Sequence, residues 1–244
     1  MSLLTELFMS SHFEVGSHPV YAELHDVVER ARIITEARVA AFMQECSLDY
    51  IVAFIGDSYT DGPVAERNAE LIDDFLRTLP NRQRFAVQTG GTQGGVPEIA
   101  TKIAREYDIP TIGVLPEATM AYVLEQPADL VIQTPDLLFG RTSFGSETPT
   151  FINMLDGLVV LGGGYGTRME VSTVLRINKS RADARRRNPI GATPPIYACP
   201  ISGTGRTADE LAALSLYEDV GDCLPETPVT NGAEASAYIG SKLH

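Results

Sequence analysis

The chain has 244 residues, of which 44% are hydrophobic and 21% are charged, a composition typical of globular proteins rather than of disordered or fibrous ones. Its formal net charge of −13 argues against a general nucleic-acid surface, because binding to phosphate backbones depends on clustered Lys and Arg. No Ser/Gly-rich linker or charge run divides the sequence, which therefore predicts one large α/β domain.

The cysteines and the N-terminal sequence indicate the compartment. Cys46, Cys199 and Cys223 are widely spaced and form no C-x-x-C pair, which fits a reducing cytoplasm. Residues 1–15 have neither a basic start nor a sustained apolar run, so neither export nor a membrane partner is expected. Because His and Cys are scattered, we expect no metal site and no resident cofactor; Mg²⁺ would enter only as the companion of a bound phosphate.

The first predicted elements are helical. Apolar side chains at helical spacing in residues 20–46 predict one or two amphipathic helices within an N-terminal extension, residues 1–48. From residue 50 onward, short apolar strands alternate with helices, beginning with a strand at 50–56 and a helix from about 64 to 79. This order is typical of a βαβ unit.

Five more strands are predicted along the chain, at 85–89, 111–115, 130–134, 157–161 and 196–200. Continuous apolar runs of this length suit parallel strands that helices bury on both faces. The predicted fold is a doubly wound, mostly parallel Rossmann-like sheet with helices on both faces. Its nucleotide-binding core would cover residues 49–215, and the tail, 216–244, is expected to be a surface element.

Three loops end predicted strands, at 56–62, 90–95 and 162–167, where such sheets bind their ligands. The first reads GDSYTDG, so Gly56, Asp57, Ser58 and Thr60 are expected to help complete a ligand cavity. A Ser esterase would need a placed His base, and none of the four histidines has such a setting. The G-x-G-x-x-G dinucleotide fingerprint and the P-loop motif are also absent.

The most informative segment is LVVLGGGYGTRME at 158–170. Its glycines would let backbone amides approach an anion, and a helix that opens near Thr167 would add unpaired N–H groups and a positive dipole end. Glu170, in the first helical turn, would point toward the same ligand as an acid, a base or an acceptor for ribose hydroxyls. The alternative is a tight turn followed by an acid that the helix dipole favours.

A second glycine cluster, VQTGGTQGGVPEIA at 87–100, repeats the order of strand, glycine turn and helix. Two such turns in one sheet indicate one shared ligand site. The candidate binding residues of this turn are Gly90, Gly91, Thr92, Gly94 and Gly95.

The run GGGYGTRME at 162–170, together with TGGTQGGVPEIA at 89–100 and FIGDSYTDG at 54–62, resembles the LOG family of the Rossmann-like SLOG superfamily. The family signature is P-G-G-x-G-T-x-x-E, and the similarity covers roughly residues 50–215. The resemblance implies a cytokinin riboside 5′-monophosphate phosphoribohydrolase or a related enzyme. Such an enzyme cuts the N-glycosidic bond of a nucleoside 5′-monophosphate to release base and ribose 5-phosphate.

Carried over to this sequence, the resemblance assigns the phosphate to the first glycine turn, 162–167, and catalysis to an acidic residue. Glu170 matches the acidic residue implicated in catalysis, and Gly90, Gly91, Gly94 and Gly95 match the second turn. The residues that match the phosphate-binding turn, with the tyrosine inside it, are Gly163, Gly164, Tyr165, Gly166 and Thr167.

Two positions depart from the family pattern. Gly162 replaces the usual proline, and the family's Arg-Lys pair is missing, its arginine position falling near Ser146. Arg141 is the candidate catalytic substitute, and Arg168 lies inside the glycine turn. Because glycosidic chemistry depends on placed charge, loss of the arginine leaves a second hypothesis open. In that hypothesis the protein is a non-catalytic binder, sensor or carrier of a phosphorylated ligand, similar to molybdenum-cofactor carriers.

The expected partners are a small nucleotide-like or phosphorylated ligand and a second copy of the chain. The family resemblance implies pairing through helices that flank the site, to which the apolar helix at 151–155 would contribute. A scaffold that binds no ligand is the third reading, and two glycine turns at strand ends disfavour it.

Overall fold

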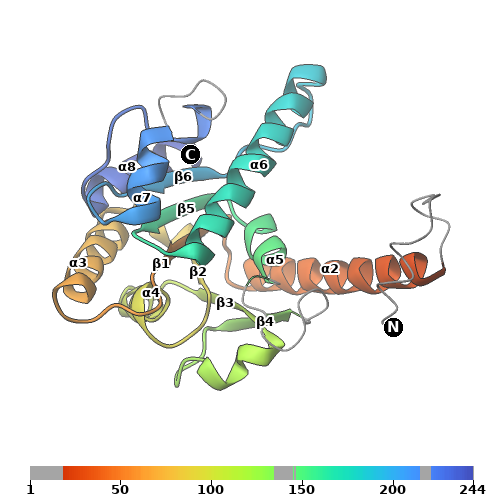
Figure 1. Ribbon diagram of the computed structural model, residues 1–244, viewed down its shortest axis with the longest axis horizontal. Coiled ribbons are helices and arrows are strands. Elements are labelled where there is room, and N and C mark those ends of the chain that lie inside the picture. The colour runs from red at the N-terminus through yellow and green to blue at the C-terminus, as the bar shows by residue number, and fades with distance from the viewer. Residues whose placement is uncertain (1–18, 135–144, 146, 215–220, 244) are drawn as a thin grey trace, which may run out of the picture. The chain divides into compact units, whose positions relative to one another are not determined.

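The computed structural model describes residues 19–134, 145, 147–214 and 221–243 (Figure 1). The chain forms two compact units that divide between Ala41 and Phe42. In the described part of the chain, no helix combines the length and the apolar character needed to cross a membrane.

The predicted N-terminal helical segment is one helix, α2 (Pro19–Glu45). Arg32 forms ion pairs with Glu29 and Glu36, three and four residues away on the same helix surface. Exposed pairs at this spacing add only a little to helix stability, because water screens the charges.

The second unit is built on a six-stranded parallel sheet, as the apolar runs predict (Figure 1). The strands are β1 (Tyr50–Gly56), β2 (Phe85–Thr89), β3 (Thr111–Pro116), β4 (Leu130–Thr134), β5 (Gly157–Leu161) and β6 (Tyr197–Pro200). Their order across the sheet is β4-β3-β2-β1-β5-β6. The prediction of a doubly wound, Rossmann-like sheet is confirmed.

Six α-helices connect and cover these strands in the described part of the second unit. They are α3 (Gly62–Thr78), α4 (Gly95–Glu106), α5 (Thr148–Asn153), α6 (Tyr165–Arg187), α7 (Arg206–Leu214) and α8 (Gly232–Leu243). Short 3-10 helices, η1 (Arg82–Arg84), η2 (Glu117–Tyr122) and η4 (Gly221–Cys223), lie in the connections.

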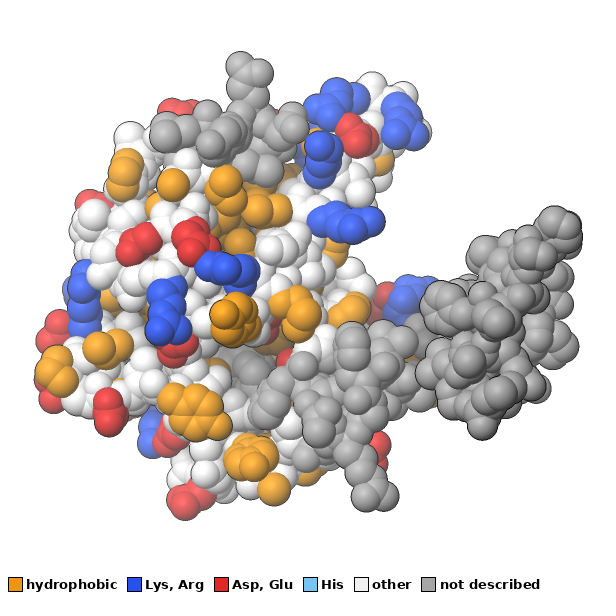
Figure 2. Space-filling view, in the orientation of Figure 1, with side chains coloured by type: hydrophobic (Ala, Val, Ile, Leu, Met, Phe, Trp, Pro, Cys, Tyr) orange, Lys and Arg blue, Asp and Glu red, His pale blue; other side chains and the backbone are white. Residues whose placement is uncertain are grey.

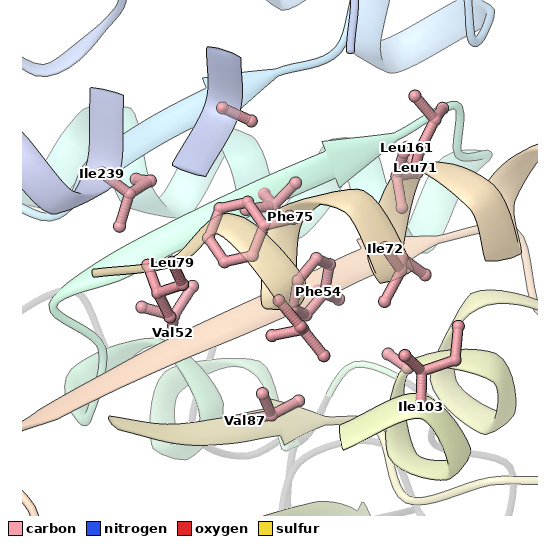
Figure 3. Close-up of a cluster of buried hydrophobic side chains, with 14 of the residues drawn as sticks. Val52, Phe54, Leu71, Ile72, Phe75, Leu79, Val87, Ile103, Leu161 and Ile239 are labelled. Atoms are coloured by element: carbon pink, nitrogen blue, oxygen red, sulfur yellow. The ribbon is translucent and has the colours of Figure 1, made fainter. Parts of the chain in front are cut away.

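One face of the sheet packs on α3, α4 and α8 and forms a continuous hydrophobic core (Figure 3). Val52 and Phe54 of β1 alternate onto this face, as strand geometry requires. Phe54 meets Phe75 of α3 edge to face, with ring centroids 5.2 Å apart. This packing fixes the positions of the strand ends at which the loops of the site begin.

The C-terminal segment differs from the expected surface element. Helix α8 buries Ala235 and Ile239 completely, and Ile239 joins the core beside α3 (Figure 3). The sequence of this segment is rich in small residues, and its few apolar side chains give a weak pattern. The prediction of a surface element was therefore wrong, because three-dimensional packing, rather than local hydrophobicity, buries this helix.

The strand order reverses at β1, which pairs with β2 on one side and with β5 on the other. In doubly wound sheets this switch point opens a crevice beyond the carboxyl ends of the strands. The loops after β1, β2 and β5 are the three loops that the sequence singles out, and all three lie at this edge.

Candidate functional site

A cavity of about 950 Å³ lies at the carboxyl edge of the sheet, around the switch point between β1 and β5. Its walls come from the loops that follow β1, β2, β3 and β5 and from the start of α5 and α6. Cavities of this size bind small organic ligands in many proteins.

The glycine turn 162–167 is hydrogen-bonded on one side to the connection between β6 and α7 and to the first turn of α7. Gly162 donates its N–H to Thr204 Oγ1 at 2.9 Å and accepts a hydrogen bond from the N–H of Ala208 at 3.1 Å. The hydroxyl of Thr207 donates to the carbonyl of Gly163 at 2.9 Å. These bonds fix the back of the turn, so its front is free to face the cavity.

The front of the turn offers backbone N–H groups. Arg168 makes the first helical bond of α6, from its N–H to the carbonyl of Gly164 at 3.0 Å. The amides of Tyr165, Gly166 and Thr167 therefore have no acceptor within the helix, as at every helix N-terminus. Together with the positive end of the helix dipole, these N–H groups can hold a phosphate or another anion.

Gly163 is the residue on which the shape of this turn depends. Its φ is +100°, a value that L side chains rarely adopt, and a Cβ at this position would overlap the side chain of Thr167. The Thr167 hydroxyl in turn donates to the carbonyl of Gly56 at 3.3 Å, which ties the end of β1 to the start of α6. The turn therefore supports the junction between the two central strands.

The second glycine turn, 90–95, differs from the first in that the chain itself accepts hydrogen bonds from three of its amides, those of Gly91, Gln93 and Gly94. Glu98 accepts the Gly94 N–H at 2.6 Å, and Val96 donates its N–H to the carbonyl of Asp57 at 3.0 Å. The ammonium of Lys102 and the backbone N–H of Gly94 lower the pKa of the Glu98 carboxyl group. The second turn thus offers fewer free amides to a ligand than the sequence suggests.

Glu170 lies on the wall of the cavity, one turn into α6. Burial and, as the smaller cause, the nearby charge of Glu147 raise the pKa of its carboxyl group to about 8. No hydrogen bond within the described part of the chain offsets the burial. At neutral pH, Glu170 is therefore mostly protonated and is able to donate a proton to a ligand.

The described lining of the cavity carries four carboxyl groups and no Lys or Arg. They belong to Asp57, Glu98, Glu147 and Glu170. Asp57 is close to the first glycine turn, since a Cβ on Gly164 would lie 3.5 Å from Asp57 Oδ1. Within the described ranges, no three acidic, His or Cys side chains come together as a possible metal site.

None of the arginines in the described residues lines the cavity. Arg168 forms an ion pair with Glu210 of α7, with N–O distances of 2.5 and 2.6 Å, and points away from the cavity. The basic run 185–187 ends α6, about 22 Å along the helix axis from Glu170, where Figure 2 shows Lys and Arg side chains gathered. Arg141 and Ser146 lie outside the described residues.

The fold brings most of the predicted site residues to one cavity. Four predicted residues are not part of the cavity lining, namely Thr60, Gly91, Gly95 and Gly163. No histidine is present in the described lining, so Ser58 has no base for nucleophilic chemistry there. The predicted residues that line the cavity are Gly56, Asp57, Ser58, Gly90, Thr92, Gly94, Gly164, Tyr165, Gly166, Thr167 and Glu170.

Sequence reasoning missed a second group of lining residues. Glu98 had a recognisable signal, since an acid in the first turn of a helix often caps the preceding amide. The others carry no local signal, because their place in the site depends on loops from other strands. Among the missed residues are Tyr59, Gln93, Glu98, Tyr122, Glu147 and Met169.

The expected pairing helix around 151–155 also differs from the prediction. Phe151, Ile152 and Leu155 are 1%, 0% and 4% exposed in the single chain. These side chains already pack inside the protein and are not available to a second copy. Their apolar run is a core signal rather than an interface signal.

Comparison with solved structures shows the same fold in proteins of low sequence identity. TM1055 aligns with a TM-score of 0.55 and 18% identity, over 79% of this chain and 99% of that one. A molybdenum cofactor binding protein from Rippkaea orientalis aligns with a TM-score of 0.55 and 20% identity, over 80% and 98%. The molybdenum cofactor carrier protein from Chlamydomonas reinhardtii gives 0.51 and 20%, with the same coverage.

The sequence comparisons define the family. No curated protein matches the chain significantly. The model of the SLOG cluster4 family matches residues 49–181, which is more than half of the chain and includes all three loops of the site. With its Rossmann-like sheet, its glycine turn at the start of α6 and this match, the chain belongs to the SLOG cluster4 family.

Proposed function

We propose that the protein binds a nucleoside 5′-monophosphate and hydrolyses its N-glycosidic bond. The observation that carries this proposal is a carboxyl group with a pKa of about 8, that of Glu170, in the same cavity as the open amides of the glycine turn 162–167. The amides would hold the 5′-phosphate. Glu170 would then lie beside the sugar and the base.

The raised pKa favours a role for Glu170 as a general acid. As the bond between C1′ and the base nitrogen breaks, its electron pair leaves with the base, which takes the proton of Glu170. Water attacks the oxocarbenium-like C1′ and gives a proton back to the Glu170 carboxylate. The products are the free base and ribose 5-phosphate, and Glu170 returns to its protonated form.

The test is to incubate the protein with a panel of nucleoside 5′-monophosphates and to measure free base and ribose 5-phosphate by chromatography. Glu170→Gln keeps the shape of the side chain but cannot transfer the proton, so we expect base release to fall about 10²- to 10⁴-fold. Nucleotide affinity, measured by thermal shift, should change little. An equal loss of affinity and turnover would contradict the catalytic role.

A second candidate function is a carrier or sensor that binds the ligand without cleaving it. The observation in its favour is that the described lining of the cavity has no Lys or Arg to stabilise developing charge. Two structures with this fold are named as a molybdenum cofactor binding protein and a molybdenum cofactor carrier protein, which makes a phosphorylated cofactor a candidate cargo. Thermal stabilisation by a nucleotide without base release would support this function over hydrolysis.

We further propose that the protein acts in the cytoplasm as a homodimer. The buried side chains at 151–155 exclude that face of α5, so the contact would involve other surfaces. Light scattering after gel filtration measures the mass directly, and a mass of 26.4 kDa at micromolar concentration would contradict the dimer.

A further inference from the structure

Three tyrosines stand exposed around the cavity. Tyr59, Tyr122 and Tyr165 are 95%, 56% and 90% exposed, and all three belong to the cavity lining. Large aromatic side chains usually gain stability by burying their rings. A group of exposed rings around a concave site therefore points to a binding role rather than a role in folding.

The three tyrosines come from the loops that follow three different strands, β1, β3 and β5. Tyr122 ends η2 after β3, and its carbonyl accepts the N–H of Gln93 at 2.7 Å, which joins it to the second glycine turn. Tyr165 is the first residue of α6 after β5. Tyr59 follows Ser58, whose carbonyl would lie 2.5 Å from a Cβ on Gly94. Loops that are distant in sequence thus bring the three tyrosines to one cavity.

The charges of the lining limit what else can enter. Beyond the amides at the start of α6, the cavity presents the carboxyl groups of Asp57 and Glu147, together with that of Glu98, which is paired with Lys102. A second phosphate would be repelled by them, whereas a neutral ring with N–H donors would find acceptors. A cavity of about 950 Å³ also exceeds what ribose 5-phosphate alone requires.

We propose that Tyr59, Tyr122 and Tyr165 form a rim that stacks on the planar, N–H-bearing ring of a ligand with a single phosphate. This inference rests on the proposed nucleotide site and specifies its ligand. The phosphate lies on the glycine turn 162–167, the ring lies between the tyrosines, and the carboxylates accept hydrogen bonds from the ring edge. Nucleoside diphosphates and triphosphates are excluded by charge.

The test measures affinity in the Glu170→Gln background, where turnover cannot remove the ligand. Isothermal titration calorimetry compares AMP, GMP, their triphosphates and ribose 5-phosphate. We expect a monophosphate to bind at least about tenfold more tightly than ribose 5-phosphate, since stacking on one aromatic ring is worth about 5- to 100-fold. The triphosphates should bind more weakly than the monophosphates.

Substitutions at Tyr165 separate stacking from simple contact. Tyr165→Phe keeps the ring and should keep the affinity for the monophosphate, whereas Tyr165→Leu should lower it about 5- to 30-fold. The affinity for ribose 5-phosphate should stay the same in both variants. Because Tyr165 is 90% exposed, neither variant should change the melting temperature appreciably. Ile190→Ala, at an 87% exposed site outside the cavity lining, is the matched control.

Specific results would overturn the inference. Ribose 5-phosphate binding as tightly as AMP and GMP, or a triple Tyr→Leu variant of the rim that retains their affinity, would show that the rings do not stack on the ligand. A triple variant with intact affinity but a smaller mass in light scattering would assign the rim to a subunit contact. Binding with the expected pattern but without base release by the wild type would support the rim and overturn only the hydrolytic function.

Discussion

At the scale of single residues, Glu170 is the group whose chemistry depends most on its surroundings. Burial and the charge of Glu147 both raise the pKa of its carboxyl group, to about 8. An acid of this kind costs stability when it ionises, because the folded protein solvates the charge poorly. A carboxyl group at this position therefore serves the proposed function at a cost in stability.

This conflict predicts a pH-dependent gain in stability for Glu170→Gln. Between its ordinary pKa of 4.5 and about 8, the folded protein binds a proton that the unfolded chain releases, so the wild type loses stability as pH rises through this window. The glutamine does not titrate. Its stability relative to the wild type, measured by urea unfolding, should rise by up to about 4 kcal/mol between pH 5 and pH 8.5. A difference independent of pH would contradict the raised pKa.

Glu147 should tune the acid without taking its place. If Glu170 acts as a general acid, wild-type base release falls as pH rises through about 8. Glu147→Gln removes the like charge and should move this fall to lower pH, but by less than about one unit, because burial is the larger cause. Glu98→Gln, in the same cavity, should leave the midpoint unchanged. An unchanged midpoint in Glu147→Gln would show that the charge of Glu147 does not act on the Glu170 carboxyl group.

At the scale of elements, the turn into α6 joins a structural requirement to a ligand requirement. Gly163 needs its positive φ and the space beside Thr167, and this geometry presents the amides of the following residues to the cavity. Gly166 is different, because a Cβ there would meet no heavy atom within 4 Å. The fold therefore explains Gly163, whereas we propose that the approach of a ligand accounts for Gly166.

The two glycines should consequently respond to alanine with opposite signs. Gly163→Ala introduces backbone strain and a collision, and should lower the free energy of unfolding by about 1–3 kcal/mol. Gly166→Ala, inside a helix, should raise it by up to about 1 kcal/mol but weaken phosphate binding. Chemical unfolding and titration with inorganic phosphate measure both effects. Destabilisation by both variants would show that Gly166 is also required by the fold.

At the scale of the whole molecule, the C-terminal helix completes the core on which the site is mounted. Ile239 of α8 is fully buried among side chains of α3 and the sheet. Ile239→Ala should lower the free energy of unfolding by about 2–5 kcal/mol, because it removes buried methyl groups and leaves a cavity. The exposed Ile190→Ala should change it by less than about 0.5 kcal/mol. Equal small effects would place α8 outside the cooperative core.

The six strands could be read from the sequence almost residue by residue, since parallel strands buried on both faces are continuous apolar runs, as at 85–89 and 157–161. Helix α8 could not, because the sequence pattern of Gly232–Leu243 does not reveal which neighbours cover it. The apolar run at 151–155 was assigned to a subunit contact for the same reason, and the single chain buries it.

The sequence by itself determined the strands, the glycine turns and the place of Glu170 near the start of the helix that follows β5, because each is fixed by residues adjacent in the chain. Only the tertiary structure decided that Glu147 and Glu98 share its cavity, that the Glu170 pKa reaches about 8, and that three tyrosines ring the opening. These properties depend on desolvation and charge from loops distant in sequence, which meet only where the strand order reverses.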